Sequence, residues 1–85
     1  MTRTYRTHAD GLGRAQLDLL DTLARASCTV TNLVDDTGRH RSTVHEALRR
    51  LRGRGLVWEP DDGLWALTGA GRHLLWRARA ARRQP

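Results

Sequence analysis

Hydrophobic residues recur at helical spacing in three stretches of the chain, which predicts three amphipathic helices. The first covers residues 12–26, begins near residues 10–13, and has its apolar positions at Leu17, Leu20, Leu23 and Ala24. The second covers residues 41–52 and carries an i, i+3, i+4, i+7 stripe of Val44, Ala47, Leu48 and Leu51. The third follows Thr68, a plausible cap, and lines one face with Leu74, Ala78 and Ala81, with Leu75 beside them.

Shorter elements are expected between these helices. Val30 lies between two threonines and predicts a very short strand within residues 27–30. Thr31 is predicted to cap a short helix over residues 32–37, which Gly38 ends in the position that favours positive φ. Residues 56–58 and 64–67 favour β-structure on either side of a turn at residues 60–63, which predicts a hairpin. The expected fold class is mainly α with a small β-hairpin wing, an α+β arrangement.

This order of elements is that of a winged helix-turn-helix, and the similarity extends to residues. Residues 29–38 and 41–51 resemble the two-helix core of bacterial winged-helix regulators such as the MarR, ArsR and IclR families. Residues 55–57 are similar to the exit of their reading helix, and residues 67–72 to the entry of MarR-like wings into the next helix. The resemblance covers about residues 14–76 and implies binding to double-stranded DNA.

The sequence departs from the pattern of these families in three ways. Arg39 stands in the turn where they usually place an apolar residue, and His40 stands where a Ser or Asp cap is usual. The predicted wing tip is acidic, with Glu59, Asp61 and Asp62, which argues against phosphate contact by the tip. The chain also shows neither long flanking helices nor a metal cluster, so no small-molecule ligand or metal is expected.

Charge is distributed unevenly along the 85 residues, whose 15 basic residues are all arginine and whose formal net charge is +6. Residues 39–58 hold six arginines and one glutamate, and residues 72–85 hold five arginines and no acidic residue. Nucleic acid is the commonest partner of such a positive field, followed by an anionic membrane. A solvated helix face is the alternative and stays open for the second block. We expect a flexible arm at 1–11, the winged domain at 12–77 and a basic helix end at 78–85.

The remaining chemistry points away from catalysis. Cys28 is the one cysteine, and it is expected to be a small buried hydrophobe. The four histidines show no metal-ligand spacing, and paired aspartates at 35–36 and 61–62 are explained by helix ends and turns. The sequence shows no leader or membrane-spanning run, so we expect a cytoplasmic protein that is not an enzyme and needs no cofactor.

The predicted reading helix divides its polar residues between two roles. Those expected to contact base edges in the major groove are Arg41, Ser42, His45, Glu46 and Arg49. Those expected to contact phosphates are Arg39, Thr43, Arg50, Arg52 and Arg54. For Glu46 the alternative is an ion pair with Arg49 or Arg50 on a solvated face. For Trp58 and Trp65, which are expected near each other across the hairpin, core packing of at least one is favoured over base stacking.

The last helix suggests a symmetric homodimer. Its apolar stripe of Leu74, Leu75, Ala78 and Ala81 extends beyond what a three-helix core would cover, so a twofold interface is expected there. The alternative is that this helix packs on its own domain and frays after Arg77. The function expected is a sequence-specific transcriptional regulator, repressor-like in type. The alternatives are a DNA-docking module of a partition, transfer or translocation system and a winged helix that binds protein.

Overall fold

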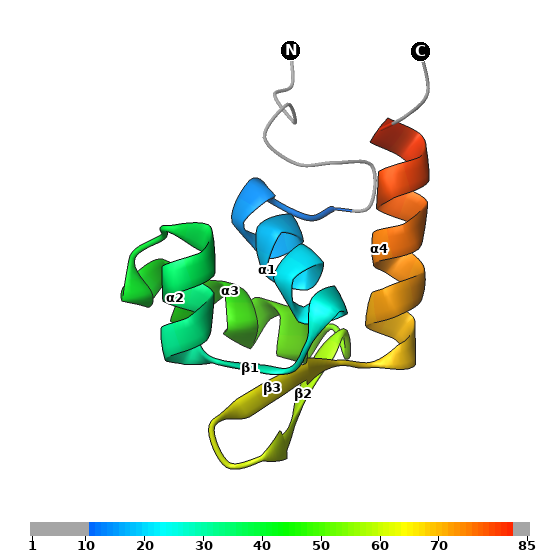
Figure 1. Ribbon diagram of the computed structural model, residues 1–85. Coiled ribbons are helices and arrows are strands. Elements are labelled where there is room, and N and C mark those ends of the chain that lie inside the picture. The colour runs from blue at the N-terminus through cyan, green and yellow to red at the C-terminus, as the bar shows by residue number, and fades with distance from the viewer. Residues whose placement is uncertain (1–10, 83–85) are drawn as a thin grey trace.

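The computed structural model describes residues 11–82, and these form four helices and a three-stranded sheet (Figure 1). The elements are α1 (Arg14–Arg25), β1 (Cys28–Thr29), α2 (Val30–Thr37), α3 (Arg41–Gly53), β2 (Val57–Asp61), β3 (Leu64–Leu67) and α4 (Gly69–Arg82). This order confirms the predicted winged helix-turn-helix. Apart from Gly11, the arm expected at residues 1–11 lies outside the described residues, as do residues 83–85.

The start of α2 differs from the prediction. Thr29, and not Thr31, is the N-cap, since its hydroxyl oxygen accepts a hydrogen bond from the Asn32 backbone N–H at 3.1 Å. The Asn32 side chain accepts in return from the Thr29 N–H at 3.2 Å, which completes a capping box. Val30 therefore opens the helix and is not in a strand. The predicted end is confirmed, because Gly38 has φ +70° and its N–H donates to the Val34 carbonyl at 2.9 Å.

The hairpin is part of a sheet with the strand order β1-β3-β2, all antiparallel. The strand predicted around Val30 lies at Cys28 and Thr29, which pair with Trp65 and Leu64. In β2 the strand continues through Pro60, which the prediction placed in the turn. Proline is tolerated there because β2 is an edge strand and its register shifts between Trp58 and Asp61. The turn itself is shorter and contains Gly63 at φ +79°.

The hydrophobic core lies between α1, α3, the sheet and α4. In α1 the predicted Leu17, Leu20 and Leu23 are buried and Ala24 is half-buried, while α3 buries all four of its stripe residues. The other buried core residues of the described chain come from α2, the sheet and α4, and include Leu33, Val57, Leu67, Leu75 and Ala78. In Figure 1, α4 lies beside α1. The β2–β3 hairpin projects from the opposite end of the molecule to the C-terminal end of α4. Cys28 is buried, as expected.

The position of α4 corrects the expected dimer interface. Leu75 and Ala78 are 2% and 3% exposed because they pack into the core of their own chain, so they are not available to a second copy. Leu74 is half-buried against the same core, while Ala81 is exposed. The helix continues to Arg82 and does not fray after Arg77, so residues 78–82 belong to it. For Leu75 and Ala78, the alternative in which α4 packs on its own domain is therefore the correct one.

The two glycines in the first turn of α4 have different surroundings. The Thr68 hydroxyl caps the helix as predicted, accepting from the Gly71 N–H at 3.0 Å and donating to the Gly55 carbonyl at 2.7 Å. A Cβ at Gly71 would overlap the carbonyl oxygen of Leu56, whereas a Cβ at Gly69 would meet nothing within 4 Å. Gly71 is therefore required for the close approach of α4 to the chain that enters β2.

Over residues 11–82, none of the helices has the length and apolar character needed to cross a membrane. Within the same range, no three His, Cys, Asp or Glu side chains are grouped so that they could hold a metal ion.

Candidate nucleic-acid interface

The outer side of α3 is polar because its inner side is fully used by the core. With Val44, Ala47, Leu48 and Leu51 buried, the helix turns its exposed side chains outwards. These exposed side chains include four of the five predicted base readers, Arg41, Ser42, His45 and Arg49. The Arg41 guanidinium lies 3.4 Å from the Thr31 hydroxyl, so it reaches toward the start of α2. The structure thus brings these four residues together on one solvent-facing side of one helix.

Glu46, the fifth predicted base reader, is bound to two arginines of its own helix. Its Oε1 accepts from Arg49 Nη2 at 2.5 Å, and its Oε2 accepts from Arg50 Nε at 3.0 Å. Hydrogen bonds from Arg49, the larger contribution, and from Arg50 lower the pKa of the Glu46 carboxyl, so this carboxyl stays ionised at neutral pH. The ion-pair alternative therefore describes Glu46 in the free chain, and a base contact by Glu46 would require these pairs to open.

Arg52 connects α3 to the wing. Its Nη1 lies 3.3 Å from Glu59 Oε1, and its guanidinium carbon lies 5.7 Å from the centre of the Trp65 ring. The other oxygen of Glu59 accepts from the Gly63 N–H at 3.0 Å, so Glu59 also closes the tip of the hairpin. A hollow of about 600 Å³ lies between α3 and β3, lined by Ser42, His45, Glu46, Leu48, Arg49, Arg52 and Trp65. Predicted base readers thus line a concave surface between helix and wing.

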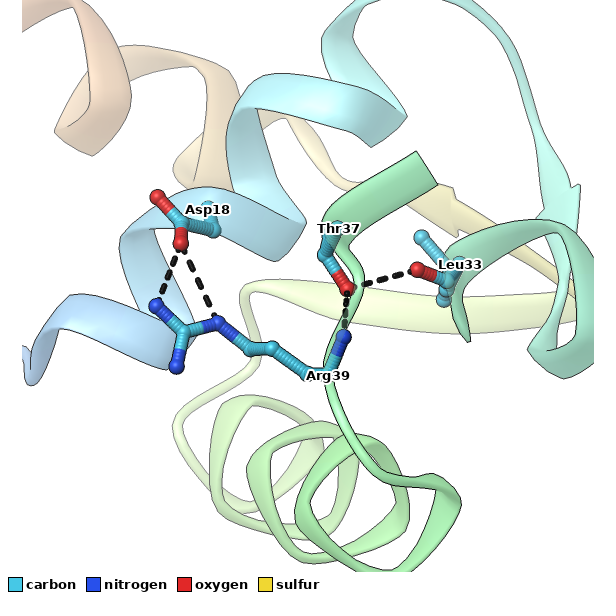
Figure 2. A network of polar contacts seen from close by, with 4 residues as sticks. All are labelled: Asp18, Leu33, Thr37 and Arg39. Carbon is cyan, nitrogen blue, oxygen red and sulfur yellow. Dashed lines mark hydrogen bonds and ion pairs between the residues drawn. The ribbon is translucent and has the colours of Figure 1, made fainter. Parts of the chain in front are cut away.

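Arg39, a predicted phosphate contact, binds a carboxylate of its own chain. Its side chain is only 28% exposed, and its Nε and Nη2 donate to Asp18 Oδ2 at 3.1 and 2.5 Å (Figure 2). Asp18 belongs to α1, so Arg39 joins the α2–α3 turn to that helix. The sequence did not indicate this pair, because the partner carboxylate lies 21 residues earlier in the chain.

The other predicted phosphate contacts lie around the outer side of α3. Arg50 and Arg52 are exposed in spite of their ion pairs, and Arg54 is exposed at the C-cap. Thr43 is half-buried. Three of the four residues are therefore accessible arginines at the middle and end of α3.

The tryptophans of the hairpin lie on opposite faces, contrary to the expected proximity. Trp58 pairs with Ala66 across the strands. Trp65 directly precedes Ala66 in β3, so its side chain points to the other face of the sheet. Trp65 is half-buried against the core, which confirms core packing for one of the two. Trp58 is 52% exposed. On α4, Trp76 is 66% exposed, with its ring 6.4 Å from that of His73.

Sequence reasoning missed the ion pairs of three carboxylates, two of which bind arginines in or directly before α3. Asp18 holds Arg39, Glu59 holds Arg52 and the wing turn, and Asp21 accepts from Arg79 Nε and Nη2 at 3.0 and 2.7 Å. The signal available was the polar face of the first helix, where Asp18 and Asp21 lie one turn apart. That spacing places two carboxylates on one side of α1 but does not identify their partners.

These features define a winged helix-turn-helix domain in which α3, the second helix of the helix-turn-helix motif, exposes an arginine-rich side to solvent. Comparison with known proteins is consistent with that class. The family model described as MarR family matches residues 10–63, which is more than half of the chain. The chain belongs to the MarR family.

Two solved structures are similar over most of the chain. A probable transcriptional regulator from Pseudomonas aeruginosa is 33% identical with a TM-score of 0.79, and the match covers 88% of this chain and 62% of that one. BpsR from Bordetella bronchiseptica, described in a mechanism for regulation of its DNA binding by 6-hydroxynicotinic acid, is 26% identical with a TM-score of 0.77. That match covers 86% of this chain and 56% of BpsR. The chain thus spans about three fifths of either neighbour. Comparison with curated proteins gives no match.

Proposed function

We propose that this chain is the DNA-binding domain of a transcriptional regulator and that α3 reads duplex DNA in the major groove. The observation that carries the proposal is the division of α3 into a fully buried apolar side and an exposed side with Arg41, Ser42, His45 and Arg49. An α-helix fits the major groove, where arginine bonds guanine in bidentate fashion and serine and histidine reach base edges. The family and the neighbour described as a probable transcriptional regulator support the same proposal.

The proposed contacts fall into two groups. Arg41, Ser42, His45 and Arg49 read bases, while Arg50, Arg52 and Arg54, with Thr43, bind phosphates. Phosphate contacts position a protein on DNA and carry no sequence information by themselves. Arg39 is left out of both groups because its guanidinium is engaged with Asp18.

We also propose that the regulator acts as a cytoplasmic homodimer of the repressor type. A twofold pair would place its reading helices in major grooves about 34 to 36 Å apart, so the site would be an inverted repeat. Of the interface residues predicted on α4, Ala81 is exposed and Leu74 is half-buried, and these two remain candidates. The two solved neighbours are longer than this chain.

A second candidate function is protein binding through the wing. It is favoured by Trp58, which is 52% exposed at the start of a strand that leads into the acidic tip with Asp61 and Asp62. Phosphates would repel that tip, whereas a basic protein surface would complement it. The density of arginine on α3 favours DNA as the main partner.

The proposal is tested by selecting binding sites from a random pool of duplex DNA. We expect enrichment of a defined motif, with its two half-sites inverted, and binding that weakens steeply as salt rises because phosphate contacts release counterions. Fluorescence anisotropy then compares the selected duplex with a random-sequence duplex of equal length. Failure to bind either duplex at low salt would refute DNA binding and favour the protein-binding wing.

A further inference from the structure

The N-terminal end of α3 is not fixed by a cap of its own. His40 occupies the N-cap position, and its side chain makes no capping hydrogen bond. In helix-turn-helix proteins, residues at the N-terminal end of the reading helix contact base edges. Here these residues are Arg41 and Ser42, directly after the α2–α3 turn. Whatever holds that turn therefore sets where these two side chains meet DNA.

The turn is held on two sides (Figure 2). On the α2 side, the Thr37 hydroxyl donates to the Leu33 carbonyl at 2.7 Å and accepts from the Arg39 backbone N–H at 3.3 Å. On the other side, the Arg39 guanidinium donates twice to Asp18 of α1. Arg39 thus uses its backbone toward α2 and its side chain toward α1, immediately before α3 begins.

We propose that Arg39 is a positioning residue for DNA recognition, which holds the start of α3 against α1 through Asp18 and so sets the geometry of base reading. The inference rests on the proposed function. Side chains that read bases need to be positioned to within about 0.5 Å. Releasing the turn from α1 therefore reduces discrimination between DNA sequences more than it reduces attraction to the DNA phosphates. Asp18 acts through Arg39 and contacts no DNA itself.

The alternative role for Arg39, a phosphate contact, predicts the opposite effect of one substitution. If Asp18 merely held a phosphate-binding arginine away from DNA, Asp18→Asn would release it and raise affinity for every duplex. If Arg39 positions α3, Asp18→Asn lowers affinity for the selected duplex. The sign of the change therefore separates the two roles.

Asp21 provides a matched control on the same helix. It also binds an arginine through two donors, but Arg79 lies on α4 and not in the turn. Asp18→Asn and Asp21→Asn remove the same charge from α1, so both raise the long-range attraction of the chain to any DNA duplex. We expect Asp18→Asn to lose about fivefold or more in preference for the selected over the random duplex, the lower range for one base contact. Asp21→Asn should keep the wild-type preference.

Three further variants, Arg39→Lys, Arg39→Gln and the double variant Asp18→Asn/Arg39→Gln, complete the test on the full chain. Arg39→Lys keeps the charge but offers Asp18 a single ammonium, so it should lose preference in the same direction while staying close to wild type in folding. The double variant Asp18→Asn/Arg39→Gln should lose no more than Arg39→Gln alone, because both changes remove one interaction. Circular dichroism at the assay temperature verifies that each variant is folded.

The outcomes separate this inference from the proposed function. If the wild-type chain binds neither duplex, the proposed function itself is refuted. If the wild type prefers the selected duplex and Asp18→Asn behaves like Asp21→Asn or binds more tightly, DNA reading stands and the positioning role is refuted. A loss of preference in Asp18→Asn, Arg39→Lys, Arg39→Gln and the double variant, but not in Asp21→Asn, supports the role.

Discussion

Arginines on α3 are partly neutralised by carboxylates of the same chain. Glu46 binds Arg49 and Arg50, and Glu59 binds Arg52, so three arginines proposed to contact DNA already have an anionic partner in the free protein. All three are more than half exposed, which makes these pairs weak and exchangeable. On DNA, phosphates would replace the carboxylate partners of Arg50 and Arg52, and a base would replace that of Arg49, so the exchange lowers the net gain from each contact. We therefore expect these ion pairs to weaken non-specific binding to DNA.

This account predicts that Glu46→Gln binds random-sequence duplex more tightly than the wild type. The salt dependence should steepen by about 0.9 in log–log slope for each arginine that gains a phosphate contact. Affinity for the selected duplex should rise less, because Arg49 loses the partner that orients it. Anisotropy titrations at several salt concentrations measure both quantities. Asp62→Asn removes an equal charge from the exposed wing tip, and an identical change in both variants would contradict the account.

At the scale of elements, periodicity was enough to place the long helices. Four apolar positions in α1 and four in α3 were predicted to face the core, and the structure buries all of them except Ala24, which is half-buried. The cap of α2 was misplaced because Thr29 and Thr31 are equally good capping residues, and the choice depends on Asn32, whose side chain completes a box with Thr29. Local sequence offers both solutions; the pairing of β1 with β3 favours the earlier one by extending residues 28–29.

Contacts between distant segments could not be predicted in this way. The partner of Arg39 lies in α1 and that of Arg79 lies 58 residues earlier, and a pattern of charges does not specify which pairs form. The same limit applies to Leu75 and Ala78, whose stripe is equally suited to a second copy or to the chain's own core. Predictions of which side of a helix is buried held where residue spacing alone defines that side. Predictions that depend on which distant segment packs against it did not.

The first turn of α4 yields a prediction about stability. Gly71→Ala places a methyl group against the Leu56 carbonyl and should destabilise the domain by about 1 to 3 kcal/mol, the cost of overpacking. Gly69→Ala, two residues earlier and with open space around its Cβ, should stabilise it by up to about 1 kcal/mol through helix propensity. Thermal or urea unfolding compares the two variants. Equal changes in both would mean that α4 does not dock on Leu56 as described.

For the whole molecule, α1 is the element to which the functional parts are attached. It packs on α2, α3, β3 and α4, and its two aspartates bind the α2–α3 turn and α4 through separate arginines. The wing is tied to α3 independently, through Arg52, Glu59 and Trp65. The helix proposed to read DNA is therefore fixed from three directions, by the turn before it, by the core beneath it and by the wing beside its end. Such a frame suits recognition by a rigid surface.

The most direct test of α3 as the reading helix compares Arg49→Ala with Arg50→Ala. The two variants remove the same charge and one Glu46 ion pair each, so they differ chiefly in which side of α3 loses an arginine. We measure the affinity of each for the selected and the random duplex at one salt concentration. Arg49→Ala should lose about 1 to 3 kcal/mol on the selected duplex alone, whereas Arg50→Ala should weaken both duplexes alike. Equal losses by Arg49→Ala on both duplexes would contradict base reading by this face of α3.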